Sequence, residues 1–262
     1  REDRVDECEL NDDKKILIFA RACDINAVHR PDNIFLKNGG AEDIFYKRIR
    51  ERVKYILLEC PQSFENCFCV SAGSNRTDEH SAAVRLGMDE ILVDVRDAEL
   101  QEYFEDEDTQ EFAVRFIEQN EKQVRIPQIN RSNLKAVSDL DYWKKFDDKC
   151  IACGGCNTVC GTCTCFDTVD IIYEEGSNEG ERRRTWSGCM LEDFTRTAGG
   201  ARSRKTQGAN MRFKVFHKFY DYKDRFGEEH MCVGCGRCDI RCPEKISFFD
   251  TVCELHDEIE KM

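Results

Sequence analysis

The chain has 262 residues, of which 40% are hydrophobic and 35% charged, and its formal net charge is −13. This length is enough for two domains with cores of their own, and the acidic balance argues against general affinity for nucleic acid. No apolar run approaches the roughly 20 residues that a membrane helix needs, and no signal segment opens the chain. Seventeen cysteines in such a chain indicate metal binding in a reducing compartment, which predicts a cytoplasmic protein.

The first predicted elements are two parallel strands. Residues 14–20 (KKILIFA) and 54–60 (KYILLEC) are short apolar runs typical of buried strands, and apolar residues recur at helical spacing over 41–53 between them. A strand–helix–strand order predicts a right-handed crossover that places the two strands parallel. Because parallel strands end at the same edge of a sheet, Cys23 and Cys60 are expected on one side of it.

A pair of cysteines, Cys67 and Cys69, follows in the next loop. With Cys23 and Cys60 they would bring four thiols to one edge of the sheet, enough for an iron–sulfur cluster. The alternative is that Cys23 and Cys60 are ordinary buried cysteines, since cysteine is among the most buried residue types. The spacing leaves both interpretations open, and the C-x-C pair, which has no obvious packing role, favours the metal site.

Residues 82–86 and 90–95 flank a Gly-Met-Asp turn and predict a hairpin. The run 97–111 that follows is strongly acidic, and such a run is usually a solvated face, with a docking role as the alternative. Residues 126–137 have the composition of a linker, so we place a domain boundary there. The first predicted domain is therefore a small α/β unit over residues 1–135.

Two cysteine runs in the second half share the spacing C-x2-C-x2-C-x3-C. They are Cys150, Cys153, Cys156 and Cys160, and Cys232, Cys235, Cys238 and Cys242, the latter followed by a proline. This spacing matches the bacterial ferredoxin run for [4Fe–4S] clusters, in which the fourth cysteine ligates the other cluster. The prediction is thus one cluster on Cys150, Cys153, Cys156 and Cys242, and a second on Cys232, Cys235, Cys238 and Cys160.

Structural zinc and a disulfide framework are the alternatives for so many cysteines. Zinc sites usually take their ligands as separated pairs, and disulfide frameworks belong to small secreted chains. Each run here offers three evenly spaced ligands and then a fourth, which favours iron–sulfur clusters. A zinc-stabilised scaffold protein remains as a function from a different class.

The segment between the two runs departs from a small ferredoxin. Gly161 follows the first run in place of a proline, and the segment is far longer than a minimal two-cluster fold needs. It contains Cys163 and Cys165, which could ligate iron, donate hydrogen bonds to cluster sulfur or pack; a supporting role is favoured because both clusters already have four ligands. The role of Cys189 is left open, and the basic segment 182–205 is either a solvated surface or a docking face.

Three helices are expected in the second half, over residues 138–150, 210–226 and 247–262. The first would open with an N-cap and an acidic first turn, and the second would stop at a glycine. The predicted fold is therefore α+β, with the small α/β domain followed by a mostly helical dicluster ferredoxin domain over residues 136–262.

Several segments together carry a family resemblance. In chain order they are Arg21-Ala-Cys23-Asp24, Cys60, Cys67-Phe-Cys69, residues 150–165, Gly180-Glu-Arg-Arg-Arg-Thr-Trp186 and Met231-Cys-Val-Gly-Cys-Gly-Arg-Cys238. In this order the chain resembles the iron–sulfur electron-transfer subunit of anaerobic sulfite reductase, and its cysteine segments are similar to those of the beta subunits of sulfhydrogenase-type hydrogenases.

The resemblance implies an electron-transfer role within a cytoplasmic complex. One partner would be a flavin- and NADH-binding subunit, and the other a sirohaem subunit that reduces sulfite to sulfide. The resemblance also implies a third [4Fe–4S] cluster on Cys23, Cys60, Cys67 and Cys69.

The residues themselves favour an electron carrier over a catalyst. The sequence contains no Gly-x-Gly-x-x-Gly after a strand, no nucleophile–base constellation and no C-x-x-C-H haem motif. A chain that holds one-electron cofactors and no group that transforms a substrate is expected to relay electrons. Sulfite reductase is the main assignment of the complex, and a sulfhydrogenase-like complex is the alternative.

Overall fold

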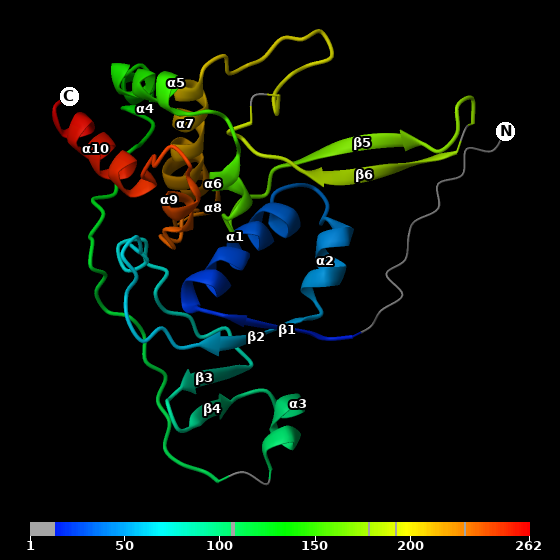
Figure 1. The fold of residues 1–262 in the computed structure, drawn as a ribbon, viewed down its shortest axis with the longest axis vertical. Coiled ribbons are helices and arrows are strands. Elements are labelled where there is room, and N and C mark those ends of the chain that lie inside the picture. Colours follow the sequence, from blue (N-terminus) through cyan, green and yellow to red (C-terminus); the bar gives the residue numbers. More distant parts are fainter. Residues whose placement is uncertain (1–13, 106–107, 178, 192, 228) are drawn as a thin grey trace.

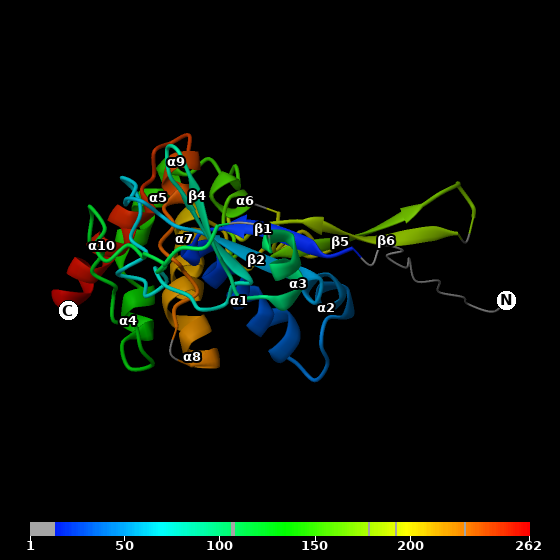
Figure 2. The same ribbon diagram turned by 90° about the horizontal axis from the view of Figure 1, so that it is seen from below.

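The computed structural model describes residues 14–105, 108–177, 179–191, 193–227 and 229–262. Helices and strands are mixed along the chain, which agrees with the α+β class. A four-stranded sheet lies in the first half, short helices gather at one end of the molecule, and a two-stranded hairpin projects from the other (Figures 1 and 2).

The four-stranded sheet has the order β1-β2-β3-β4. The strands are β1 (Ile16–Ala20), β2 (Val53–Leu58), β3 (Ala82–Leu86) and β4 (Ile91–Val95). Strands β1 and β2 pair in parallel, as do β2 and β3, while β3 and β4 are antiparallel. The expected parallel strand pair and the expected hairpin are both confirmed.

Two helices lie between β1 and β2, where one was expected. Helix α2 (Ile44–Arg50) is the predicted one, but α1 (Ala22–Lys37) runs through a stretch that contains Pro31 and for which no helix was expected. An interior proline removes a helical hydrogen bond and usually ends a helix. In α1, Pro31 is instead buried, and it continues a helix that also buries Ile25 and Arg30.

The second half is built from short helices around a shared core. They are α4 (Leu134–Ser138), α5 (Lys145–Lys149), α6 (Gly155–Thr158), α7 (Gln207–Phe216), α8 (Tyr222–Phe226), α9 (Arg237–Arg241) and α10 (Phe248–Glu260). Helix α10 and the combined α7–α8 rod confirm two predicted helices, although a π-helical turn over His217–Asp221 interrupts the rod. The expected single helix over 138–150 is wrong, because Ser138 ends α4 and a 3-10 turn over Asp141–Lys144 precedes α5.

A hairpin of β5 (Phe166–Ile172) and β6 (Gly180–Trp186) corrects the expectation of a mostly helical second half. Its strands face solvent on both sides, so they lack the apolar alternation that marks a half-buried strand. Cross-strand charge pairing helps to hold it: Arg182 Nε lies 2.7 Å from Asp170 Oδ1, and these residues are register partners.

The acidic run 97–111 is only partly regular. It starts with α3 (Ala98–Gln101) and a 3-10 turn over Glu102–Phe104, and its members Asp106 and Glu107 lie outside the described residues. Residues 108–131, which include the end of this run, form neither helix nor strand.

The largest core joins the two halves of the chain. Phe68, from the loop after β2, is 1% exposed and packs in the same cluster as Trp143, Phe146, Val215 and Phe248. A smaller core between α1 and the sheet contains residues of both, such as Ile25 and Leu57. The loop with Cys67 and Cys69 is thereby held against the helices of the second half.

Candidate metal centre

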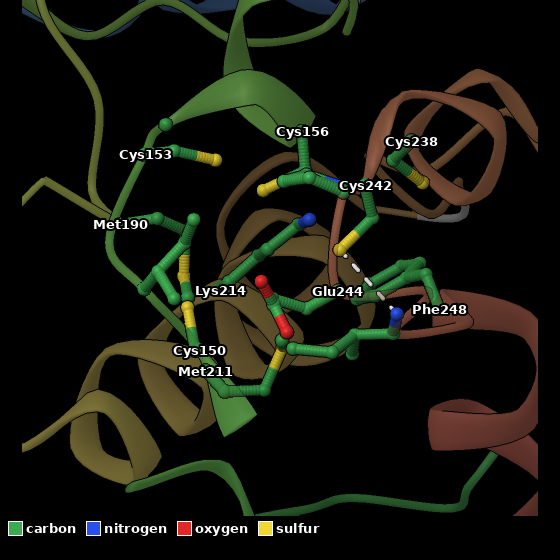
Figure 3. Close-up of a pocket in the computed structure, with 14 residues that line it drawn as sticks. Cys150, Cys153, Cys156, Met190, Met211, Lys214, Cys238, Cys242, Glu244 and Phe248 are labelled. Carbon is green, nitrogen blue, oxygen red and sulfur yellow. Dashed lines mark hydrogen bonds between the residues drawn. The ribbon is translucent and has the colours of Figure 1, made fainter. Parts of the chain in front are cut away.

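One cavity collects thiols from both cysteine runs. Cys150 and Cys153 come from the loop between α5 and α6, Cys156 lies in the first turn of α6, and Cys242 follows α9 directly. All four line the cavity shown in Figure 3, together with Cys238 and the apolar side chains Met190, Met211 and Phe248. The first three cysteines of one run therefore share a cavity with the fourth cysteine of the other, in the arrangement that the ferredoxin pattern predicts.

The two cysteine loops have matching backbone conformations. Gly154 and Gly236 precede the third cysteine of their runs by two residues, and both have φ of 69°. Two positions earlier in each run, Ala152 and Gly234 have φ of 55° and 62°. Left-handed conformations are strained for alanine and free for glycine. The same pair of left-handed residues therefore wraps each loop around its three thiols.

The remaining cysteine of the first run, Cys160, lies with the second run. Burial raises the pKa of Cys232 to about 12, and the charges of Cys160 and Cys235 add to this rise. Burial likewise raises the pKa of Cys235, with Cys160 again among the neighbouring charges. Cys238 has Cys232 and Cys160 as charged neighbours too. Lys218 links Cys160 to this run, because its carbonyl oxygen accepts from the Cys232 N–H and its Nζ donates to Thr162 Oγ1, which lies 3.3 Å from Cys160 Sγ.

The four N-terminal cysteines also converge. Cys23 lies in the first turn of α1, just after β1, and Cys60 follows β2 at the same edge of the sheet. Burial raises the pKa of Cys60, and the charge of Cys67 contributes to the rise; Cys60 in turn contributes to the raised pKa of Cys69. Cys23 has both Cys69 and Cys235 as charged neighbours.

Direct contacts fix this N-terminal group against the second run. The backbone N–H of Phe68 donates to the carbonyl oxygen of Gly234 at 2.8 Å, and Arg237 forms two hydrogen bonds with the carboxylate of Asp24, one of them 2.9 Å between Nη2 and Oδ2. Built on Gly236, a Cβ would stand 2.2 Å from the carbonyl oxygen of Asn66. The loop that carries Cys67 and Cys69 therefore touches the second run through backbone atoms, at a position where only glycine fits.

Asn157 brings together two of the cysteines outside these three groups. Asn157 is 1% exposed, and its Nδ2 lies 3.5 Å from Cys163 Sγ and 3.4 Å from Cys189 Sγ. Cys165 has Cys189 as a charged neighbour. The sequence pattern left the role of Cys189 open and did not single out Asn157, because only the fold brings Cys189 to Asn157, which directly follows Cys156.

Two lysines are the functional candidates that the sequence pattern missed. Lys214 and Lys218 are each 3% exposed and lie four residues apart on the α7–α8 rod. The sequence does indicate that they are buried, because at helical spacing these positions share a face with the apolar residues Met211 and Val215. A lysine on an apolar face needs a negative partner.

The donor set fits iron–sulfur clusters. Clusters of this type are held by cysteine thiolates, four to each, and the two pairings above supply four thiols each, lined by apolar side chains and buried cations. Among the described residues, no three or more His, Cys, Asp or Glu side chains are grouped so as to hold a metal ion. The assignment of each thiol to a cluster therefore stays a prediction.

Comparisons with known proteins bear on the cofactor and the family. Residues 149–246, which include both cysteine runs, match the family described as a 4Fe-4S dicluster domain. The chain is also 30% identical over 264 residues to "Sulfhydrogenase 2 subunit beta" of Pyrococcus furiosus, across 95% of this chain and 76% of that protein. The chain belongs to the family of this beta subunit. No solved structure matches it.

The family membership confirms the coarser expectations. The chain is an iron–sulfur electron-transfer subunit with a 4Fe–4S dicluster domain, and it is related to one subunit of a larger oxidoreductase. The finer assignment to sulfite reductase finds no support in these matches, which favour the sulfhydrogenase alternative. In the described part of the chain, no helix is long and apolar enough to cross a membrane.

Proposed function

We propose that this chain is the electron-transfer subunit of a sulfhydrogenase-like complex and relays single electrons between two partner subunits. The cavity that Cys150, Cys153 and Cys156 share with Cys242 is the observation that carries the proposal. Two ferredoxin runs that exchange their fourth cysteines hold two clusters next to each other. Neighbouring clusters can pass electrons from one to the other.

The ligands are assigned to three sites. The first site is formed by Cys150, Cys153, Cys156 and Cys242; the second by Cys232, Cys235, Cys238 and Cys160; the third by Cys23, Cys60, Cys67 and Cys69. Each bound [4Fe–4S] cluster supplies one-electron chemistry. The chain's own part is to bind the clusters, exclude water and set their surroundings.

The neighbours of these thiols suggest an order for the sites. Asp24, next to Cys23 of the third site, is hydrogen-bonded to Arg237 of the second run. Cys238 of the second site in turn lines the cavity of the first. The second site would therefore stand between the other two, and electrons would pass along the series.

The ends of the series differ in their exposure. Cys153 of the first site is exposed, and Ile151 beside it is 59% exposed. The proposal keeps two domains, residues 1–135 with the third site and residues 136–262 with the first and second sites. One partner would then exchange electrons near the first site, and a flavin- and NADH-binding partner is a candidate for the other end.

The test is anaerobic co-purification of the full chain with its natural partners, followed by metal analysis. The proposal expects a brown protein with about 8 to 12 iron atoms per chain, at four per cluster, and a hydrogenase-type catalytic partner. A sirohaem-containing partner would move the chain back to sulfite reductase. A colourless protein with zinc would overturn the electron-transfer role altogether.

A further inference from the structure

Two buried ammonium groups stand among the candidate cluster ligands. Lys214, in α7, and Lys218, in the π-helical turn, are each 3% exposed. Residues four apart share one face of a helix, where like charges repel each other. Two lysines in this arrangement are stable only if negative charge lies close to both.

One carboxylate, that of Glu244, lines the same cavity as Lys214, but the two side chains do not form an ion pair. The Nζ atom of Lys218 donates to Thr162 Oγ1 at 2.6 Å and lies 3.6 Å from Cys163 Sγ. The Nζ atom of Lys214 lies 4.6 Å from the centre of the Phe248 ring, and it points into the cavity of the first site between Cys156 and Cys242 (Figure 3). Among the residues that the structure describes, neither lysine forms an ion pair with Asp or Glu.

Thiols take the place of carboxylates around both lysines. Lys214 lines one cavity with Cys156 and Cys242 of the first site and Cys238 of the second. The Nζ atom of Lys218 lies beside Cys163 Sγ, and the backbone N–H of Cys163 donates to the carbonyl oxygen of Cys160 at 3.1 Å. Lys214 therefore faces ligands of both the first and the second site, whereas the cluster ligands nearest Lys218 belong to the second site alone.

The π-helical turn fixes Lys218 against the second run. The carbonyl oxygen of Lys218 accepts hydrogen bonds from the backbone N–H groups of Met231, at 2.9 Å, and Cys232, at 3.4 Å. A π-turn frees backbone carbonyls from the regular helical pattern, and such turns often occur at functional sites. The start of the second run is thus tied to the residue whose ammonium group faces it.

We propose that Lys214 and Lys218 are positioning residues that raise the reduction potentials of the clusters: Lys214 those of the first and second sites, and Lys218 that of the second only. The inference rests on the proposed function. Reduction adds one electron to a thiolate-ligated cluster that is already anionic, and a fixed positive charge in a water-poor interior favours the more negative state. Removing either charge should therefore lower the potential of each cluster that it faces.

The experiment is a potentiometric titration of the full chain, followed by electron paramagnetic resonance, for the Lys214→Met and Lys218→Met variants. Methionine keeps much of the side-chain length and removes the charge. Lys144→Met is the matched control, because the Lys144 side chain is 73% exposed and pairs with Asp141. The signal that disappears in Cys150→Ala identifies the first cluster.

For Lys214→Met we expect the equilibrium constants for reduction of the first and the second cluster each to fall at least tenfold, which is about 59 mV for each one-electron step. For Lys218→Met we expect only the constant of the second cluster to fall. For Lys144→Met we expect no change in either cluster. Should Lys214→Met fail to hold iron, Lys214→Gln removes the charge and keeps a polar head, and the same two shifts are expected.

Variants with full iron content and unchanged potentials would overturn the inference and leave the proposed function intact. A shift of the first cluster alone in Lys218→Met would overturn the assignment of the two lysines. Wild-type protein without iron would instead refute the proposed function, so the two failures are distinguishable.

Discussion

Double substitutions of cysteine test the crossed ligand pairing most directly. Cys242 follows Cys232 within one run, yet it lines the cavity of Cys150, Cys153 and Cys156. If those four bind one cluster, Cys150→Ala and Cys242→Ala remove ligands of the same site. Combining them should cost no more iron than either change alone. Combining Cys232→Ala with Cys242→Ala should remove two clusters.

The size of the effect follows from the number of sites. With three sites and four iron atoms per cluster, the unmodified chain should hold about 12 iron atoms, and Cys150→Ala, Cys242→Ala and their combination about 8 each. The combination of Cys232→Ala with Cys242→Ala should hold about 4. If ligation followed the sequence instead, these two double variants would exchange their values.

The assay is iron and sulfide analysis of the anaerobically purified chains. Electron paramagnetic resonance spectra of the reduced chains identify which clusters remain. Cys253→Ala is the control, since Cys253 lies on α10 and belongs to none of the three sites. The crossed pairing is refuted if Cys150→Ala with Cys242→Ala holds less iron than Cys232→Ala with Cys242→Ala. Equal loss in both double variants would point to unfolding, which circular dichroism of each variant detects.

Three further outcomes are expected. Cys60→Ala should lower the iron content by about four atoms and leave the other two clusters; unchanged iron would show that the N-terminal cysteines bind no cluster. Phe68→Ala should lower the free energy of unfolding by about 3–5 kcal/mol in urea titrations, because the ring is 1% exposed and packs edge-on against Phe249 with centroids 6.0 Å apart. Gly236→Ala should cost about 1–3 kcal/mol in the same assay, because its Cβ would stand 2.2 Å from the Asn66 carbonyl oxygen; an unchanged midpoint would mean that the loop yields freely.

Local patterns in the sequence were enough to predict the parts of this protein whose physics is local. The spacing of each cysteine run determines how a loop wraps around three thiols, and the structure has the same left-handed turns in both loops. The apolar runs that became β1 and β2 needed only their composition and length. Helix α10, which begins after its N-cap Ser247, agrees with the helix expected over residues 247–262.

Other elements depend on contacts that no local pattern contains. An interior proline normally ends a helix, but α1 continues through Pro31. The helix buries Arg30, which donates a hydrogen bond to the carbonyl oxygen of His230 at 2.9 Å. The hairpin of β5 and β6 has no buried face, so its strands carry no apolar alternation from which to predict them.

The surroundings of the candidate clusters were decided by tertiary structure alone. Lys214 and Lys218 share a helix face with apolar residues in the sequence, but only the packing of the α7–α8 rod against the cysteine loops places their ammonium groups among the thiols. The loop carrying Cys67 and Cys69 meets the second run through contacts across more than 150 residues, such as the hydrogen bond from the Ser74 hydroxyl Oγ to the Val233 carbonyl oxygen. Ligand spacing is a property of a few consecutive residues, whereas the charges around a ligand come from every element that packs against it.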